Sequence, residues 1–380
     1  MANSIYITGD IANDYFLIRG RRFYSDDQTE GTTYIHHRGG AWLIYEFLDE
    51  IRKVKESLRD KEFPDVQFGY EEDIFAELPE KNNSFASVSP FHIAKNQHAW
   101  RIDEFFGFGS YSDAIQDVSD KVIPSDDKTS IYIVDDAGVE FGSEQNADTW
   151  HALIKTIETS NRTSKETLVI CKKSGDIHHG RLFNELLESS GEQRMQLLTI
   201  ISVNDIRRQE ARISSGLSWE QSAIDLVYEL KTNPALNYLN KSSYLVVTFQ
   251  SSGALFVVNQ GNGLSEYKLI FDPCSIEGDD DGKNDGWIIG RMSLFTAAFA
   301  SSLDLKKKDK YYLVENAIKA GLTAIRIFYK TGYKPYETGV FFPYREVALG
   351  LIKNEFSFSS AFVPSPGENP AFLDTAVNGK

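Results

Sequence analysis

The chain has 380 residues, of which 41% are hydrophobic and 25% are charged, a composition typical of a soluble globular protein. Its formal net charge of −15 argues against binding of the nucleic-acid phosphate backbone, and no apolar run approaches the length of a membrane-spanning helix. The two cysteines, Cys171 and Cys274, give neither a metal-ligand spacing nor a disulfide framework. We therefore expect a cytoplasmic protein whose partners include neither nucleic acid nor a membrane.

Hydrophobic runs of strand type alternate with stretches of helical periodicity along most of the chain, which predicts an α/β fold. The first strand is expected at Ser4–Thr8, and two more exposed strands at Tyr15–Arg19 and Thr33–His37, on either side of a polar loop. Gly39-Gly40 then opens an amphipathic helix that runs to about Leu58.

Residues 59–127 lack this alternation, and we interpret much of the segment as a lid or insertion. Elements of the lid are expected at about 15–38 and 84–111. From Ser130 the alternation is regular, and three strands, each followed by a helix or helical turn, are expected at 130–135, 167–172 and 196–202. The pattern predicts a doubly wound, mostly parallel sheet with helices on both faces and a small β lid.

The last third of the chain adds a hairpin, a further strand and two helices. Their expected positions are 244–249 and 254–258 for the hairpin, 266–272 for the strand, and 294–303 and 312–329 for the helices. We predict that residues 1–333 form the α/β domain and that 334–380 are a C-terminal extension. This extension is expected to be partly flexible from about 364, where Pro, Gly and Asn accumulate.

A glycine turn leads directly into an apolar helix at the segment Gly290 to Ser293. Such a turn points backbone N–H groups and the positive end of the helix dipole at one place, which suits a phosphate or another anion. The candidate anion-binding residues are therefore Gly290, Arg291 and Met292. Ser293 is a candidate catalytic residue.

This turn and helix resemble those of the PfkB/ribokinase family of sugar kinases, whose Gly-Ala-Gly-Asp turn ends on the aspartate that acts as catalytic base. The similarity extends over about residues 4 to 333. It implies a ribokinase-like fold, ATP and Mg²⁺ as cofactors, and phosphorylation of a small sugar- or nucleoside-like molecule. We also consider a homodimer formed through the β lid, which the sequence does not decide. At the position of the base this chain has Ser293, a hydroxyl that does not accept a proton near neutral pH without help.

Two motifs near the N-terminus continue the resemblance on the substrate side. The segment Gly9 to Asp14 resembles the family's Gly-x-x-x-x-Asp, whose aspartate binds sugar hydroxyls. Asp14 suits that role because a carboxylate accepts two hydrogen bonds from a diol, although a capped strand-end turn explains the same residues. Gly39 and Gly40 are similar to the family's Gly-Gly-x-x-Asn loop, whose glycines let a ligand approach the backbone. The Asn position holds Leu43, which cannot hydrogen-bond a sugar.

Two further motifs lie on the nucleotide side. Thr248 and Gly253 resemble parts of the Thr-x-Gly-x-x-Gly-Ala hairpin that lines the family's nucleotide site, although a tight hairpin needs Gly253 for geometry alone. Asn204 matches the first residue of an Asn-x-x-Glu motif that orders magnesium through water, but the Glu position is Arg207. We interpret Asn204 as a helix N-cap instead.

Charged residues at strand ends and in one loop complete the candidates. Lys173 follows a predicted strand and could neutralise a phosphate as a point charge, or it could be a solubilising strand-end residue. The acidic loop 272–285 precedes the glycine turn, and Asp285 is a candidate for a displaced general base. Its spacing matches no EF-hand, so we interpret the loop as solvated and expect no metal-binding residues.

The departures at Leu43, Arg207 and Ser293 leave two main hypotheses of function. The first is an ATP-dependent small-molecule kinase with unusual substrate and catalytic residues, the latter being Ser293 and Asp285. The second is a pseudokinase, which keeps the cleft as a nucleotide- or small-molecule-binding regulatory module and no longer transfers phosphate. A third, weaker hypothesis is an interaction protein that uses the aromatic lid and the tail beyond Gly332 to bind another protein.

Overall fold

The structure is a computed structural model of the chain. It describes residues 4–19, 32–58, 63–69, 99–105, 130–137, 141–142, 144, 147–163, 167–174, 181–208, 211–213, 219–249, 252–259, 265–272, 290–303, 305, 310–330, 343–353 and 356–362. Among the helices in these ranges, none is long and apolar enough to cross a lipid bilayer.

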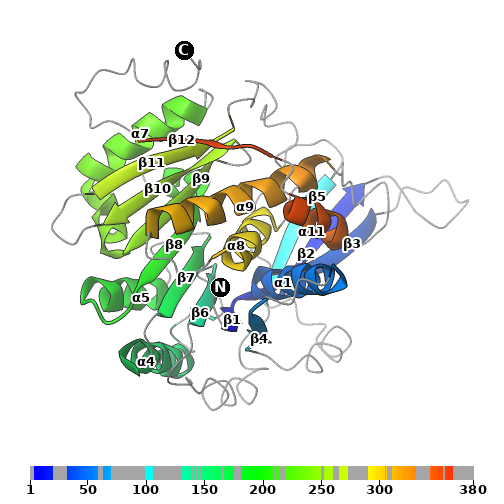
Figure 1. Ribbon diagram of the computed structural model, residues 1–380, viewed down its shortest axis with the longest axis horizontal. Coiled ribbons are helices and arrows are strands. Elements are labelled where there is room, and N and C mark those ends of the chain that lie inside the picture. Colours follow the sequence, from blue (N-terminus) through cyan, green and yellow to red (C-terminus); the bar gives the residue numbers. More distant parts are fainter. Residues whose placement is uncertain are drawn as a thin grey trace, which may run out of the picture.

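A nine-stranded sheet forms the centre of the molecule, with strand order β12-β11-β10-β9-β8-β7-β6-β1-β4 (Figure 1). The strands from β4 to β9 run parallel, and the hairpin β9–β10 starts an antiparallel edge that ends at β12. The strand bounds are Ser4–Gly9 (β1), Asp65–Phe68 (β4), Ser130–Asp136 (β6), Thr167–Lys173 (β7), Leu197–Ser202 (β8), Tyr244–Phe249 (β9), Gly253–Asn259 (β10), Ser265–Phe271 (β11) and Ser359–Phe362 (β12).

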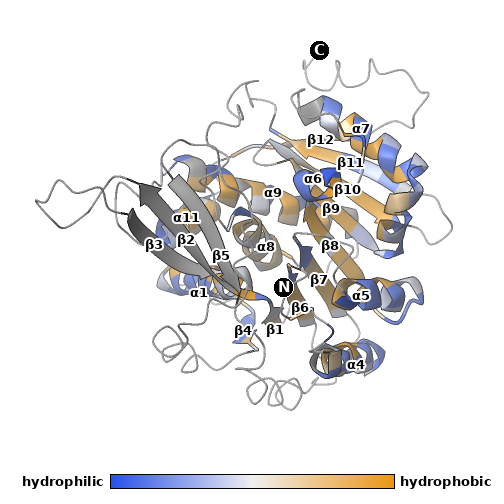
Figure 2. Ribbon diagram, turned by 180° about the vertical axis from the view of Figure 1, so that it is seen from behind, coloured by the Kyte–Doolittle hydropathy of each residue, from blue (hydrophilic) through white to orange (hydrophobic). Residues whose placement is uncertain are grey.

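The central strands are continuous apolar runs because both faces of the sheet are covered. Alternate residues of β6 pack on opposite sides: Ile131 and Ile133 join one buried cluster, and Tyr132 and Val134 join the other. Figure 2 shows the matching hydropathy, with hydrophobic strands in the sheet and helices that are hydrophilic on their outer side. The expected α/β doubly wound, mostly parallel sheet is confirmed.

Helices cover the two faces of this sheet. One face carries α1 (Gly40–Ser57), α8 (Arg291–Ser301), α9 (Lys310–Lys330) and α11 (Tyr344–Lys353). The other face carries α4 (Ala147–Thr163), α5 (Arg181–Gly191), the short α6 (Val203–Arg207), α7 (Trp219–Thr232) and the 3₁₀ helix η4 (Pro234–Lys241).

A separate three-stranded antiparallel sheet lies beside α1, away from the β10–β12 edge of the large sheet (Figures 1 and 2). Its strands are β2 (Ile11–Arg19), β3 (Thr32–Gly39) and β5 (Ala99–Phe105), with β2 in the middle. The two N-terminal strands expected at Tyr15–Arg19 and Thr33–His37 are found as β2 and β3, and β5 completes this small sheet. Much of the second expected lid element, 84–111, lies outside the described residues.

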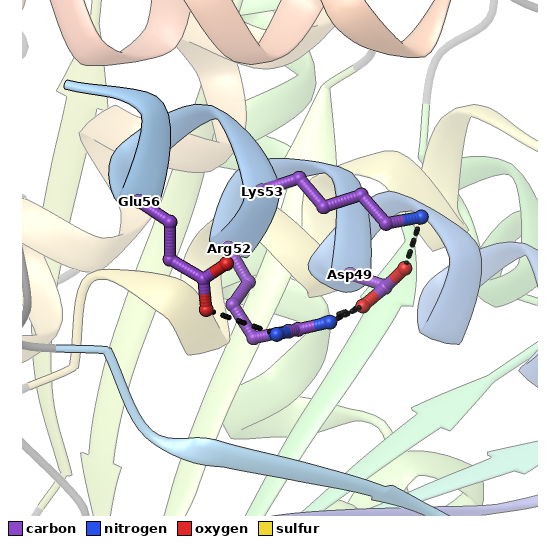
Figure 3. A network of polar contacts seen from close by, with 4 residues as sticks. All are labelled: Asp49, Arg52, Lys53 and Glu56. Carbon is purple, nitrogen blue, oxygen red and sulfur yellow. Dashed lines mark hydrogen bonds and ion pairs between the residues drawn. The ribbon is translucent and has the colours of Figure 1, made fainter. Parts of the chain in front are cut away.

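Helix α1 shows why the sequence folds as it does next to this small sheet. Its outer side carries ion pairs at helical spacing, with Arg52 bonded to Asp49 at 2.5 Å and to Glu56 at 2.9 Å, and Lys53 to Asp49 at 2.6 Å (Figure 3). Such pairs add only tenths of a kcal/mol each. Burial of the opposite, apolar side decides the position of the helix, through Leu43, Phe47, Ile51 and Val54.

The described part of the C-terminal segment contributes to both the helical layer and the sheet. Helix α11 buries Val347 and Ala348, and its Tyr344 hydroxyl donates to Glu46 Oε2 of α1 at 2.9 Å. Strand β12 pairs antiparallel with β11 at the edge of the large sheet. Independent folding of residues 1–333 stays a prediction.

Candidate functional site

The candidate site lies where the first turn of α8 meets the loop before α1 and the end of β9. The Ser293 hydroxyl is 3.4 Å from the Gly40 carbonyl oxygen, and the Thr248 hydroxyl is 3.2 Å from Met292 Sδ. Residues from three distant parts of the chain, all expected from the sequence to bind ligand, are thus brought into direct contact. The carboxyl edge of a parallel sheet is where open α/β folds place their ligands.

Gly290 makes the turn into α8 possible. It is the N-cap residue and has a left-handed φ of 77°, a conformation that a glycine adopts without steric cost. Every residue from Ser293 to Ser301 is buried, so the helix axis is fixed in the core. The positive end of the helix dipole, at Arg291 and Met292, is therefore held in place at the edge of the sheet.

The loop before α1 is equally constrained. Gly40 has φ of 63°, and a Cβ atom there would lie 2.2 Å from the Asp10 carbonyl oxygen. The neighbouring Ala41 N–H donates to that same oxygen at 2.8 Å. Gly40 is thus required by close backbone approach. Leu43, at the position of the family's substrate-binding Asn, is fully buried in the core beneath the site, so its side chain cannot line a ligand cleft.

Ser293 is buried, with 2% of its surface exposed. Its hydroxyl can donate to the Gly40 carbonyl, which is an acceptor only. Within the described part of the chain, no ionisable side chain hydrogen-bonds this hydroxyl. The arrangement gives Ser293 a structural contact between α8 and the start of α1, rather than the surroundings of a proton acceptor.

The β9–β10 hairpin expected from the sequence is confirmed, with Gly253 paired to Phe249. A Cβ atom at Gly253 would lie 2.7 Å from the Ile270 carbonyl oxygen of β11, so packing within the sheet is one reason for glycine here. Thr248 faces α8, as its bond to Met292 shows. The roles of Thr248 and Gly253 in nucleotide binding stay predictions.

The interpretation of Asn204 as a helix N-cap is wrong. The N-cap of α6 is Ser202, whose side chain accepts from the Asp205 N–H and donates to Asp205 Oδ2. Asn204 instead accepts a hydrogen bond at 2.9 Å from Arg207, which also bonds Ser222 of α7 at 2.9 Å. The sequence could not distinguish the caps because Ser and Asn are about equally favoured at this position.

These contacts bear on the magnesium that the family resemblance implies. The amide oxygen of Asn204 is engaged by a guanidinium, a cation that repels a metal ion at the same place. Within the ranges that the structure describes, no group of three or more His, Cys, Asp or Glu side chains could hold a metal ion. The described residues of this motif therefore do not fit magnesium.

A cluster of buried charges lies at the ends of β6 and β7. Lys172 bonds Asp135 at 2.6 Å, and Lys173 lies 3.3 Å from Asp136. The two pairs point to opposite faces of the sheet, because neighbouring strand residues alternate. Lys173 is fully buried and its ammonium lies 5.9 Å from the centre of the Phe183 ring. The ammonium group of Lys173 is paired with Asp136. Binding of an anion by Lys173 stays a prediction.

Asp10 is the polar residue of this edge that our sequence reasoning missed. It is 1% exposed, and its carboxylate accepts from the Ala137 and Phe141 N–H groups, both at 2.7 Å. Burial raises the pKa of Asp10 from 3.8 to about 7, with a further contribution from Asp136 and opposition from the two N–H groups. The signal in the sequence was the position of Asp10 directly after a buried strand. Within the same motif, we assigned a functional role to Asp14 instead.

Asp14 and Asp285 are the remaining candidates. Asp14 lies in β2, paired with His37 and Asp103 in the small sheet, and its role in substrate binding stays a prediction. Asp285 and most of the acidic loop lie outside the described residues.

Comparison with known proteins gives a distant likeness in structure only. No protein-family model matches the chain, and no curated protein matches it. The chain is similar to pyridoxal kinase from Leishmania donovani in complex with ADP and pyridoxamine, at 10% identity, 95% coverage of this chain, 100% of that chain and a TM-score of 0.49. It is also similar to ribokinase from Giardia lamblia (11% identity, 91% and 98% coverage, TM-score 0.44) and to Methanocaldococcus jannaschii nucleoside kinase, an archaeal member of the ribokinase family (14%, 92% and 98%, 0.41).

Proposed function

We propose that this protein is a pseudokinase: a module that binds a nucleotide together with a sugar- or nucleoside-like small molecule, and in which Ser293 does not act as a catalytic base. The bound phosphate lies against the N–H groups of the first turn of α8, from Arg291 onward. The small molecule lies on the side of Gly39 and Gly40. ATP is the nucleotide that the sequence resemblance favours.

The position of Ser293 is the observation that supports this proposal most directly. The backbone of the turn suits a phosphate, since Gly290 has the left-handed conformation that starts α8 and the helix is fixed by burial. The residue that would remove a proton from the acceptor hydroxyl is a buried serine within hydrogen-bonding distance of the Gly40 carbonyl. We therefore infer that binding is kept and that Ser293 does not take up the proton.

One contact supports the proposed residues of the nucleotide side. Thr248 touches Met292 and so lies beside the proposed phosphate position, with Gly253 across the hairpin. Because the described part of the Asn204 motif does not fit a metal, nucleotide binding is proposed to need no magnesium at that motif. Asp14 would contact the small molecule from the small sheet.

Isothermal titration calorimetry with ATP, with added Mg²⁺ or with chelator, tests the binding. We expect saturable binding by the wild-type chain, and a loss of at least tenfold in affinity for Gly290→Ala, because alanine is strained at φ of 77° and would disturb the turn. Gly191→Ala is the matched control, since a Cβ there meets only ordinary contacts at 3.6 Å or more. Absence of ATP binding by the folded wild-type chain would refute the proposal.

Transfer is measured separately, with ATP labelled in its γ-phosphate and a panel of sugars and nucleosides. We expect binding without transfer. Transfer that survives in Ser293→Ala would instead indicate a kinase with a displaced base, and Asp285→Asn would then show whether Asp285 supplies it.

A further inference from the structure

The first turn of α8 carries a methionine, Met292, whose side chain is only partly buried. The other methionine in the described part of the chain, Met195, lies in the core with 2% of its surface exposed. A thioether that solvent reaches is open to oxidation to the sulfoxide, which is polar where methionine is apolar. An oxidant in solution therefore has access to Met292, whereas the fold protects Met195.

The backbone around Met292 is fixed, so a chemical change at this residue is confined to its side chain. The Leu294 N–H donates to the Gly290 carbonyl at 2.8 Å and closes the first turn. The Met292 carbonyl accepts from the Thr296 hydroxyl at 2.7 Å. All residues from Ser293 to Ser301 are buried. The N–H groups of the first turn therefore keep their places when the thioether changes.

The side chain of Met292 reaches from α8 to the end of β9. The Thr248 hydroxyl lies 3.2 Å from Met292 Sδ and donates to it. Thr248 is 2% exposed, so this donor is held in place by the sheet. A thioether sulfur is a weak acceptor, whereas the oxygen of a sulfoxide carries a partial negative charge and accepts strongly. Because that oxygen is bonded to Sδ, it stays close to the Thr248 hydroxyl and to the positive end of α8, and both stabilise it.

We propose that Met292 is an oxidation site, and that its sulfoxide weakens the binding of a phosphate at the first turn of α8. The oxidant is hydrogen peroxide. A lone pair of Sδ attacks one peroxide oxygen and the O–O bond breaks, after which the departing hydroxide takes the proton from the transferred oxygen. The products are the sulfoxide and water, so that sulfur is oxidised and peroxide is reduced.

The effect on the site follows from a competition between two acceptors. The sulfoxide oxygen and a phosphate oxygen are both attracted by the Thr248 hydroxyl and by the N–H groups that begin α8 at Arg291. The partial negative charge of the sulfoxide oxygen also repels the phosphate at short range. This effect on nucleotide affinity rests on the proposed function, whereas the oxidation of Met292 does not.

Peptide mass mapping after brief exposure to hydrogen peroxide tests the oxidation itself, without any ligand. In the folded chain we expect Met292 to form its sulfoxide about tenfold faster than Met195, because solvent reaches the first side chain and not the second. In urea, where both side chains are exposed, the two rates should converge. Equal rates in the folded chain, or faster oxidation of Met195, would overturn Met292 as the oxidation site.

Calorimetric titrations with ATP before and after peroxide test the consequence for the site, with dithiothreitol added after the treatment to reverse disulfide formation. We expect the affinity of the wild type and of the control Met195→Leu to fall about tenfold, and methionine sulfoxide reductases for both sulfoxide epimers to restore it. The affinity of Met292→Leu should not change on treatment, whatever its starting value. An equal fall in Met292→Leu, or none in the oxidised wild type, would overturn the coupling between Met292 and the site. If the untreated wild type binds no ATP, the proposed function and this coupling fall together, and the mass mapping still decides the oxidation site.

Discussion

We expect that removing the hydroxyl of Ser293 does not affect ligand binding. A charged side chain at this position should lower the stability of the fold. Ser293→Ala removes one long hydrogen bond to Gly40 and should change the free energy of unfolding by no more than about 1 kcal/mol. Ser293→Asp, the residue type of the kinase family, would place a buried carboxylate against the Gly40 carbonyl and should destabilise the fold by about 2 kcal/mol or more. Urea denaturation of both variants measures this. Equal stability of the two variants would contradict the buried contact.

The raised pKa of Asp10 predicts how the stability of the fold depends on pH. Its pKa is about 7 in the folded protein, above its ordinary value of 3.8, so the folded state binds more protons between about pH 4 and pH 7. The contribution of Asp10 to the free energy of unfolding therefore falls as the pH rises through that window. Between about pH 4 and pH 7, the free energy of unfolding of the wild type should fall by up to about 4 kcal/mol relative to that of Asp10→Asn. A shift of one pKa unit corresponds to about 1.4 kcal/mol.

Denaturation of both proteins at several pH values measures this difference. Other titrating groups are common to the two chains and largely cancel. Parallel pH profiles would show that Asp10 is ionised in the folded protein at the same pH as in the unfolded chain. The protonated acid suits the folded state because burial penalises the charged form.

At the scale of the elements, the packing of α1 predicts the effect of placing an asparagine at Leu43. Leu43→Asn gives the chain the family's residue type, but Leu43 is fully buried in the cluster between α1, α8 and the sheet. An amide there lacks the apolar volume and leaves polar groups buried. We expect a loss of about 2–5 kcal/mol in unfolding free energy and no gain in sugar binding. Thermal unfolding with and without sugars checks this, and a sugar-stabilised variant would contradict it.

The packing of α8 on α9 depends on Gly321, which no local sequence pattern indicates. A Cβ atom at Gly321 of α9 would lie 2.6 Å from Cδ2 of Phe295 on α8. Gly321→Ala should therefore destabilise by about 1–3 kcal/mol, despite the better helix propensity of alanine. Gly191→Ala, with room for a Cβ, should not destabilise. Denaturant unfolding of the two variants checks this, and a stable Gly321→Ala would mean that the Phe295 ring moves freely.

Local patterns were sufficient to predict most elements but not the contacts between them. The strand expected at 130–135 is found as β6, because an uninterrupted apolar run fits a strand buried on both faces. The contacts of Asp10 with Ala137 and Phe141 join positions far apart in the chain, and no local pattern indicates them. The chemistry of Leu43 argued against a role in sugar binding, but its burial could be known only from the fold.

At the scale of the whole molecule, the limits of the folding unit can be measured by truncation. Ending the chain after residue 333, the boundary predicted from the sequence, removes α11 and β12. Val347 and Ala348 are fully buried, and the ring of Tyr344 stacks 6.1 Å from that of Phe47 on α1. Loss of these contacts also exposes apolar surface on α1 and α9. We expect a decrease of more than about 3 kcal/mol in unfolding free energy, since each large apolar side chain contributes about 1.5–3 kcal/mol on burial.

A chain ending after Phe362 is the control for this truncation. It keeps every described helix and strand, including the pairing of β12 with β11, and should unfold at the wild-type denaturant concentration. Differential scanning calorimetry of both truncated chains would also show whether unfolding remains a single transition. If the chain of residues 1–333 unfolds like the wild type, α11 and β12 are accessory to the fold and the predicted boundary holds. If it unfolds early while the longer chain does not, the folding unit extends to β12, because helix α11 and the edge strand complete its layers.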